Sequence, residues 1–581
     1  MPTRIQRREK CTAAFLGAAL GDAFGWPYES SRRTSGNADG PEWTRKVGSH
    51  FDPWVEVVRL GEYSDDTQLI LATARSLLKE GKFWTAHFCN VELPAWRIYE
   101  RGGGRATKAA ATLLAEGQYP WNASDVKRRA YFDAGGNGAA MRILPHVVHQ
   151  GEDRQALIRD VILNSVCTHG HPRAIVGALS HALALENLFM RSSTLEYGEL
   201  ITTVLEQTHE LKFECLSHAF AQDFLSGVEE QISVNKYAHS WDATINEMLQ
   251  MLELALQETR KGALASEGEY LRKIGALETK TNGAGTVSAA AAIFLAARYA
   301  VDPGAGLKNI VRMRGLDTDT VGSMACSLLA AVNGEAWLSG EAVQLQDFDY
   351  IRGIADKLFS FAESASVSSS ASFEAPPLKA PRINLDRLLE TPQVGSSIEI
   401  PLIGSVTVTR LSEQKDRHRQ TVARIYVVRA FDGQTLHLRA KLKLPARRGV
   451  LVDLHEDSPT KIGIRFYTRN LAAVRKFYES VLGLIPEKCT DATVVYSPNV
   501  VFADANLEGK LLFHQPDEAS AIVIEVRDFE RLQEKLRSHR IRVESTPTRS
   551  NRQMLVLRDP DERRIEIFAS RVISPHAEES T

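Results

Sequence analysis

The sequence predicts a multidomain protein: an all-α domain, then a small all-β module, then an α+β domain built from a repeated βαβββ unit. Three observations lead to this fold class. Apolar residues recur at helical spacing through the first 362 residues, a serine- and proline-rich stretch interrupts that pattern, and short alternating segments follow it. A chain of 581 residues is also too long for one hydrophobic core.

The first domain, residues 1–362, is predicted to be almost entirely helical, and alternating strand patterns are nearly absent from it. Its clearest amphipathic runs are 69–78, 174–188, 244–256, 287–300 and 321–332. Glycine-rich loops at 102–104, 135–138 and 282–285 directly precede helices. Ordinary turns are one interpretation of these loops, and anion sites at helix N-termini are the other.

Residues 363–393 are predicted to form a linker, flexible where serine dominates and semi-extended where proline does. Residues 394–457 contain short strand patterns and are expected to form a small barrel or sandwich. Positions 394–455 carry 11 Lys and Arg against 5 Asp and Glu. A solvated basic face is the favoured interpretation over nucleic-acid binding, because no series of aromatic residues suited to stacking bases accompanies the charge.

The last domain, residues 458–572, alternates strands and helices. Strand 461–468 and helix 471–481 precede short strands at 493–496, 500–503 and 510–514. Strand 521–526, helix 529–537 and strands 554–558 and 565–569 repeat that order, which indicates an internal duplication. Residues 573–581 are predicted to be a flexible tail.

Composition favours a soluble cytoplasmic protein with no membrane partner. The formal net charge of -2 gives no general case for binding nucleic acid or an anionic membrane. The six cysteines are scattered without a C-x-x-C pair, so neither a zinc site nor a disulfide framework is indicated. No segment has the run of about 18 apolar residues that a membrane span needs, and the apolar run near the N-terminus ends at Asp22.

Two acidic clusters, at 63–67 and 316–320, each place two carboxylates beside hydroxyl side chains at the entrance of a predicted helix. Hard cations such as Mg²⁺ take oxygen ligands from carboxylates, hydroxyls and water. One acidic pair alone is usually a solvated cap. Two such clusters indicate a shared two-metal site.

Five motifs give residues 8–360 a resemblance to the ADP-ribosylglycohydrolase family, which includes the dinitrogenase-reductase-activating glycohydrolases. In the order of the family they are 17–29, 63–67, 135–142, 168–172 and 317–322. The resemblance implies an orthogonal helical bundle with a binuclear Mg²⁺ centre at the base of a cleft.

The resemblance also implies a ligand set for two Mg²⁺ ions, with Mn²⁺ as the alternative. The matching positions are Ser64, Asp65 and Asp66 on one side and Asp317, Asp319 and Thr320 on the other. An all-oxygen set favours these metals over zinc. The family often has Thr at the position of Ser64, which offers the same hydroxyl oxygen.

The implied reaction cleaves the bond between C1″ of the distal ribose of ADP-ribose and a protein side chain, through an oxocarbenium-like state. Asp66 and Asp319 are candidates for orienting or deprotonating the attacking water. Glu29 matches the family's loop glutamate and is the candidate for proton transfer or for gating the cleft. The alternative for Glu29 is a plain surface glutamate.

The pyrophosphate is expected to meet the N–H groups of Gly135, Gly136, Asn137 and Gly138. His169 is either a substrate contact or a structural residue, and His171 is expected to be structural. Residues 102–105 are a candidate for a further wall. Tyr131 and Phe132 are candidates either for adenine stacking or for the core.

Residues 470–484 and 558–568 resemble the vicinal-oxygen-chelate superfamily of glyoxalase I and bleomycin-resistance proteins. The family's ligand positions fall at Gly463 and Ala521, and only Glu566 keeps a ligand-type residue. We therefore expect a metal-free domain that serves in ligand binding or in homo-oligomer formation.

The leading hypothesis is a Mg²⁺-dependent hydrolase that removes mono-ADP-ribose from a modified macromolecule, most simply a protein. One alternative is hydrolysis of ADP-ribosylated nucleic acid or of a free nucleotide. Another is an immunity protein that neutralises an ADP-ribosylating toxin by binding or hydrolysis. A purely structural role is disfavoured, because four buried acids without a metal are costly.

Overall fold

The structure is a computed structural model of the chain. It describes residues 2–569 apart from 30–32, 36–37, 50–51, 219–221, 339, 341–343, 365–374, 417–420, 444–463, 469–470, 482–487, 490–492, 498–499, 505–520, 527–528, 539–540, 542, 548–552 and 559–563. The chain divides into two compact units, residues 1–446 and 447–581, and each is described by itself.

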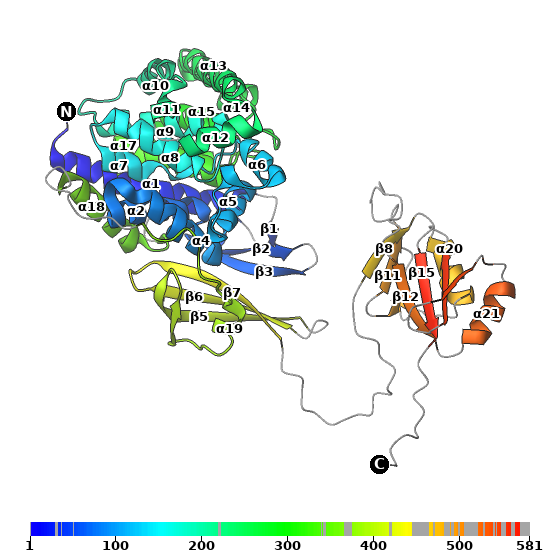
Figure 1. The fold of residues 1–581 in the computed structure, drawn as a ribbon. Coiled ribbons are helices and arrows are strands. Elements are labelled where there is room, and N and C mark those ends of the chain that lie inside the picture. The colour runs from blue at the N-terminus through cyan, green and yellow to red at the C-terminus, as the bar shows by residue number, and fades with distance from the viewer. Residues whose placement is uncertain are drawn as a thin grey trace. The chain divides into compact units, whose positions relative to one another are not determined.

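Helices dominate the first unit, as predicted (Figure 1). In chain order they are α1 Arg4–Gly25, α2 Asp65–Glu80, α3 Trp84–His87, α4 Leu93–Tyr99, α5 Arg105–Ala115, α6 Asp125–Phe132, α7 Leu144–Gln150, α8 Arg154–Val166, α9 Pro172–Phe189, α10 Glu199–His209, α11 Glu214–His218, α12 Gln222–Gln231, α13 Val234–Thr259, α14 Glu267–Lys273, α15 Gly285–Tyr299, α16 Pro303–Val311, α17 Thr318–Asn333 and α18 Phe348–Ser364. The five predicted amphipathic runs lie in α2, α9, α13, α15 and α17. Within the described part of the chain, no helix is long and apolar enough to cross a membrane.

Helices α1 and α17 pack with their backbones almost in contact. A Cβ atom added to Gly17, Gly21 or Gly25 of α1 would lie 2.5, 2.1 or 2.1 Å from a carbonyl oxygen of α17. Such an approach requires glycine, because any larger side chain would overlap the partner backbone. The contact brings the C-terminal end of α1 to the N-terminal end of α17, where the loop before Thr318 ends.

A small antiparallel sheet interrupts the helices, and the sequence did not indicate it. Its strands are β1 Arg33–Ser35, β2 Glu42–Ser49 and β3 Asp52–Arg59, in the order β1-β2-β3. The first domain is helical as predicted, but the expectation that strands are nearly absent from it missed these three.

The side-chain pattern of β2 and β3 explains this error. Arg45 and Glu56 lie on the buried face, with 3% and 1% of their surfaces exposed, and they form an ion pair with a 2.8 Å contact. Val55 and Val57 lie on the outer face, with 36% and 45% exposed. Around Glu56 the usual alternation of a half-buried strand is therefore inverted, whereas Trp43 and Val58, which pair farther along the hairpin, are buried.

The middle segment forms one four-stranded antiparallel sheet in the order β4-β5-β6-β7. Its strands are β4 Ser397–Ile400, β5 Gly404–Asp416, β6 Thr421–Ala430 and β7 Thr435–Lys443. Among the described strands β4 does not pair with β7, and the segment contributes one sheet rather than two, so it forms neither the expected barrel nor the expected sandwich by itself.

This sheet belongs to the same compact unit as the helices. Its buried side chains, among them Tyr426, Leu436 and Leu438, join the hydrophobic core of the helical body. Figure 1 shows the sheet along the side of the body that also carries β2 and β3. The segment 394–443 is therefore not a module apart from the helical domain.

The described part of the predicted linker also packs on the helical body. The amide of Asn90 donates a hydrogen bond to the carbonyl of Pro376 at 2.6 Å, and the N–H of Ala380 donates to the carbonyl of Ala115 at 3.1 Å. A short helix, α19 Leu385–Leu388, leads to the sheet. Residues 375–393 are therefore a fixed strap, and the serine-rich residues 365–374 lie outside the described part.

The second unit confirms the internal duplication. Its two four-stranded sheets have the orders β8-β11-β10-β9 and β12-β15-β14-β13, and in both the first strand pairs in parallel with the last. The elements are β8 Ile464–Thr468, α20 Leu471–Arg475, β9 Lys488–Cys489, β10 Thr493–Ser497, β11 Val500–Asp504, β12 Ala521–Val526, α21 Phe529–Ser538, β13 Glu544–Pro547, β14 Gln553–Arg558 and β15 Arg564–Ala569. Glu566 lies in β15 opposite Val556 of β14, and Gly463 and strand 510–514 lie outside the described residues.

Candidate active site

A cavity of about 750 Å³ opens in the helical body, and acidic residues form part of its wall. The 3₁₀ turn after α1 contributes Glu29, the start of α2 contributes Asp65 and Asp66, and the start of α17 contributes Asp317 and Asp319. Both predicted acidic clusters and the loop glutamate therefore reach one cavity.

The entrance of α2 is fixed by Asp22, to which the sequence analysis gave no role. The N–H groups of Ser64 and Thr67 each donate to its carboxylate at 3.0 Å, and the Thr67 hydroxyl donates at 2.6 Å. Asp22 is fully buried in the part of α1 that follows Lys10, which is otherwise apolar except for Thr12. A single acid inside such a helix was the available sequence signal, because a buried carboxylate needs hydrogen-bond donors.

The two acidic clusters meet at Asp66. Its Oδ2 accepts hydrogen bonds from the Ser64 hydroxyl at 3.3 Å and from the Thr320 hydroxyl at 3.4 Å. Its Oδ1 is buried and has no hydrogen-bond partner among the described residues. A buried oxygen in that state calls for a ligand, because an unsatisfied polar group is costly.

Asp317 and Asp319 are held by their neighbours. The side-chain amide of Asn137 donates to Asp317 at 2.8 Å and to Ser288 at 3.0 Å. The N–H of Thr320 donates to Asp319 at 2.8 Å. One carboxylate oxygen from each of Glu29, Asp317 and Asp319 lies within 4.8 Å of the other two.

The electrostatics of these acids favour a bound cation. Burial raises the pKa of Asp65, Asp66 and Asp319 well above the usual range, and nearby carboxylates raise each pKa further. For Asp66 the neighbours are Asp22, Asp65 and Asp317. A divalent cation would neutralise this crowding and allow the acids to ionise.

The donor set fits Mg²⁺ or Mn²⁺. Every candidate ligand offers oxygen, and the unpartnered Oδ1 of Asp66 supplies a free ligand position. Five of the six predicted ligands line the cavity, and the fully buried Ser64 lies behind Asp66 with its hydroxyl in the local hydrogen bonds. Ligation by these residues stays a prediction.

The glycine loop differs from the predicted phosphate cradle. Gly136, Asn137 and Gly138 line the cavity, while Gly135 is not among its described lining residues. The Asn137 N–H donates to the carbonyl of Gly283 at 2.9 Å, so it is not available to a phosphate. The two glycine-rich loops instead form a bridge that holds Asn137 beside Asp317.

His169 is buried and lines the cavity. Arg142 donates to the Thr168 hydroxyl at 2.8 Å, and that hydroxyl shares a hydrogen bond with Nδ1 of His169 at 2.7 Å. Burial lowers the pKa of His169 to about 3, which keeps the ring neutral. Arg142 also donates to the carbonyl of Gly138 at 2.8 Å, a linking role that the sequence analysis missed.

The remaining candidates separate into wall and core. Gly102, Gly104 and Arg105 line the cavity, in agreement with the predicted further wall. Tyr131 lines the cavity while its hydroxyl donates to the carbonyl of Val166, and Phe132, buried beside it in an aromatic core, is not among the described lining residues. His171 is structural, because it caps the start of α9 by accepting a hydrogen bond from the Arg173 N–H.

Comparison with known proteins gives two family matches. Residues 3–366, well over half of the chain, match the model of ADP-ribosylglycohydrolase, and residues 463–567 match that of the glyoxalase/bleomycin resistance protein/dioxygenase superfamily.

Two curated relatives match the helical part. The ADP-ribosyl-[dinitrogen reductase] glycohydrolase of Rhodospirillum rubrum is 26% identical over 215 residues, which cover 36% of this chain and 67% of that protein. The uncharacterized protein YegU of Escherichia coli (strain K12) is 24% identical over 354 residues, covering 56% of this chain and 89% of its own.

Solved structures are similar to each unit. An ADP-ribosylglycohydrolase-related protein complex covers 62% of this chain and 99% of its own, with 20% identity and a TM-score of 0.40. A lactoylglutathione lyase from Agrobacterium tumefaciens covers 19% of this chain and 95% of its own, with 14% identity and a TM-score of 0.17.

Proposed function

The chain belongs to the ADP-ribosylglycohydrolase family, and we propose that it is a Mg²⁺-dependent hydrolase that removes mono-ADP-ribose from a modified protein. Membership of the family supports hydrolysis of an ADP-ribose linkage. One observation carries the finer proposal: the two acidic clusters and Glu29 meet in one cavity, where Oδ1 of the buried Asp66 has no partner within the described chain.

The metal ligands would be Ser64, Asp65 and Asp66 from the start of α2, and Asp317, Asp319 and Thr320 from the start of α17. When bound, Mg²⁺ supplies Lewis acidity that orients ribose hydroxyls and makes water a better nucleophile.

The chain's own residues prepare the attack on C1″. Asp22 holds the entrance of α2, and Asn137 holds Asp317, so the carboxylates are positioned before substrate arrives. Asp66 or Asp319 orients the attacking water or accepts its proton. Glu29, at the same cavity, gives a proton to the leaving acceptor atom or gates its access.

The rest of the cavity suits a sugar–pyrophosphate. Its volume of about 750 Å³ lies within the usual range for ligand sites. Gly136, Gly138 and Gly102 keep the wall free of bulk beside the acids. His169 lines the same cavity as a neutral ring and adds no charge.

The test is a panel of defined ADP-ribosylated acceptors, assayed with the full chain with and without Mg²⁺. We expect release of ADP-ribose from at least one modified protein only when Mg²⁺ is present. Asp317→Asn and Asp319→Asn should abolish release, while Asp349→Asn, at an exposed position of α18, should not. Undiminished release by the Asp317 and Asp319 variants would refute the proposal.

The described part of the basic β4–β7 sheet does not favour a nucleic-acid substrate. Arg410, Arg424 and Arg439 form ion pairs with Glu62, Glu413 and Glu56. Their charge is therefore used inside the unit rather than presented to phosphates.

A further inference from the structure

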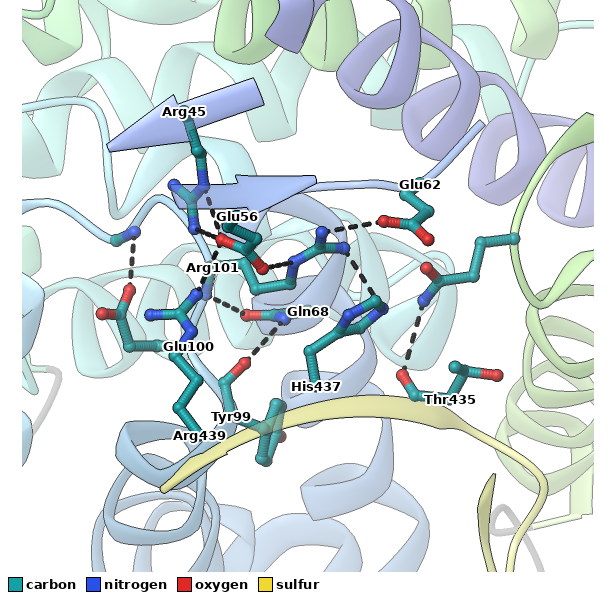
Figure 2. A network of polar contacts seen from close by, with 12 residues as sticks. Arg45, Glu56, Glu62, Gln68, Tyr99, Glu100, Arg101, Thr435, His437 and Arg439 are labelled. Atoms are coloured by element: carbon teal, nitrogen blue, oxygen red, sulfur yellow. Dashed lines mark hydrogen bonds and ion pairs between the residues drawn. The ribbon is translucent and has the colours of Figure 1, made fainter. Parts of the chain in front are cut away.

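A buried network of charged side chains lies where the β4–β7 sheet meets the helical body (Figure 2). Arg101, in the loop after α4, is at its centre and has no exposed surface. Its Nε donates to Glu56 at 3.0 Å and its Nη2 donates to Glu62 at 2.8 Å. Two buried acids, one from β3 and one from the loop before α2, therefore hold two of its three guanidinium nitrogens.

The third nitrogen is held by the sheet. Nη1 of Arg101 lies 3.3 Å from Nε2 of His437 on β7, the yellow strand of Figure 2. Arginine can only donate, so Nε2 of this histidine accepts and its ring is neutral. His437 is itself 2% exposed. Burial lowers its pKa to about 3, in agreement with that assignment.

Two arginines of the sheet reach the same acids. Arg439 donates to Glu56 at 3.1 Å, and Arg410 donates to Glu62 at 3.2 Å. The sheet therefore closes the network over Arg101 and excludes water from it. Polar groups buried in this way tolerate few arrangements, because each lost hydrogen bond leaves a buried charge uncompensated.

Arg101 connects directly to the active-site wall. Gly102 follows it in the chain, lines the cavity, and has a φ of +99°. A Cβ atom at Gly102 would lie 3.0 Å from Oδ1 of Asp65, so the backbone of this wall is in close contact with a candidate ligand. The Arg101 N–H also donates to Gln68 of α2 at 3.3 Å, which ties the wall to the helix that carries Asp65.

Arg101 connects to the Glu29 turn through Trp26. The guanidinium carbons of Arg45 and Arg101 lie 4.7 and 5.0 Å from the centre of the Trp26 ring, and the ring is almost fully buried. Trp26 begins the 3₁₀ turn that ends immediately before Glu29. Contacts between guanidinium groups and an indole are favourable, and they hold this turn in place.

We propose that the β4–β7 sheet acts on the active site through His437, which fixes the guanidinium of Arg101, and that Arg101 is a positioning residue for the 102–104 wall and for the turn that carries Glu29. The expected effect on the reaction rests on the proposed hydrolase function. The expected effect on the structure of the wall and of the turn does not. The sheet is then part of the catalytic unit rather than a device for choosing a target.

The experiment compares two substitutions at His437 in the full chain. His437→Leu removes the acceptor at similar bulk, and His437→Gln restores an acceptor oxygen. Lys441→Ala is the matched control, because it removes an exposed cation four positions along the same strand. Hydrogen exchange of residues 100–105 is measured by mass spectrometry, and kcat and KM are measured for release of ADP-ribose.

In His437→Leu we expect exchange of residues 102–105 about tenfold faster and kcat about tenfold lower, the loss typical of a disturbed supporting residue. KM should change less than kcat, because the wall and the turn position reacting groups. His437→Gln and Lys441→Ala should match the parent in both measurements. If His437→Leu does not fold, His437→Asn, whose side chain is too short to reach Arg101, replaces it.

Exchange in His437→Leu equal to that of the parent would overturn the proposal, and so would faster exchange with unchanged kcat. If the parent protein releases no ADP-ribose, the proposed function fails. The exchange comparison would still decide whether His437 holds the wall.

Discussion

Asp66 and Asp22 are both buried aspartates near the start of α2, yet replacement by asparagine should have opposite effects on the metal-free protein. Asp22 accepts hydrogen bonds on both oxygens, from Ser64 and Thr67. Asp66 leaves Oδ1 without a partner in the described chain and has carboxylates as neighbours. In the presence of a chelator, Asp66→Asn should therefore stabilise the protein and Asp22→Asn should destabilise it.

The magnitudes follow from the contacts. Asn at position 66 is neutral at every pH, whereas Asp66 must either hold a proton or bury a charge with no partner on one oxygen, a difference worth roughly 1–3 kcal/mol. Asn at position 22 turns an amide N–H₂ toward the donating N–H of Ser64 and loses roughly the same amount. Because the pKa of Asp66 is raised, the folded chain keeps a proton that the unfolded chain releases. The gain from Asp66→Asn should thus grow as the pH rises above the ordinary aspartate pKa of 3.8.

The assay is thermal unfolding of the first transition, in chelator and then in Mg²⁺. At about 100 times its Kd, Mg²⁺ should stabilise the parent protein by about 2.7 kcal/mol and Asp66→Asn by clearly less. The advantage of Asp66→Asn over the parent should therefore shrink, by up to about 2.7 kcal/mol, when metal is added. A lower Tm for Asp66→Asn than for the parent in chelator, or an equal gain from Mg²⁺ in both, would refute the reasoning.

Three further expectations concern the fold. A chain that ends at residue 446 should stay folded and active by circular dichroism and ADP-ribose release, whereas one that ends at residue 362 should aggregate, because it loses the sheet that covers Arg101. Gly21→Ala should lower the Tm by many degrees, since its Cβ would lie 2.1 Å from the Gly322 carbonyl oxygen. Gly353→Ala in α18, where the added Cβ would meet open space, should instead raise the free energy of unfolding by about 1 kcal/mol. Glu56→Gln should lose about 3–5 kcal/mol near neutral pH by urea unfolding. Because three arginines keep the Glu56 pKa well below 4.5 despite its burial, its contribution is present above pH 4.5, and the difference from the parent should shrink as the pH falls below that value.

The helical part of the fold was predictable because its helices bury broad apolar faces. α9 and α15 are apolar along most of their length, and their sequences indicate helices whatever they pack against. The duplication in the second unit was predictable for a related reason, since strand and helix periods alternate there in the same order twice.

The charged elements were not predictable in the same way. A basic residue such as Arg439 normally indicates a solvated surface, yet it pairs with Glu56 from a distant strand. Glu56, the partner that compensates the burial of Arg439, is far away in sequence, so no local pattern reveals the pair. The inverted hairpin and the docking of the β4–β7 sheet were both missed for this reason.

The site was predictable in its residue types and not in its hydrogen bonds. Two oxygen-rich clusters indicated a cation site, and the structure brings them together at Asp66 and Thr320. Which N–H groups remain free depends on contacts between loops. Pairing of Asn137 with Gly283 removes one predicted phosphate donor and makes the Asn137 side chain a support for Asp317.

The three glycines of α1 determine how the site can vary between related proteins. Because α1 and α17 touch through their backbones, no side-chain rotamer can lengthen or shorten the distance between them. The spacing between the Glu29 turn and Asp317 is thus set by the packing of the two helices.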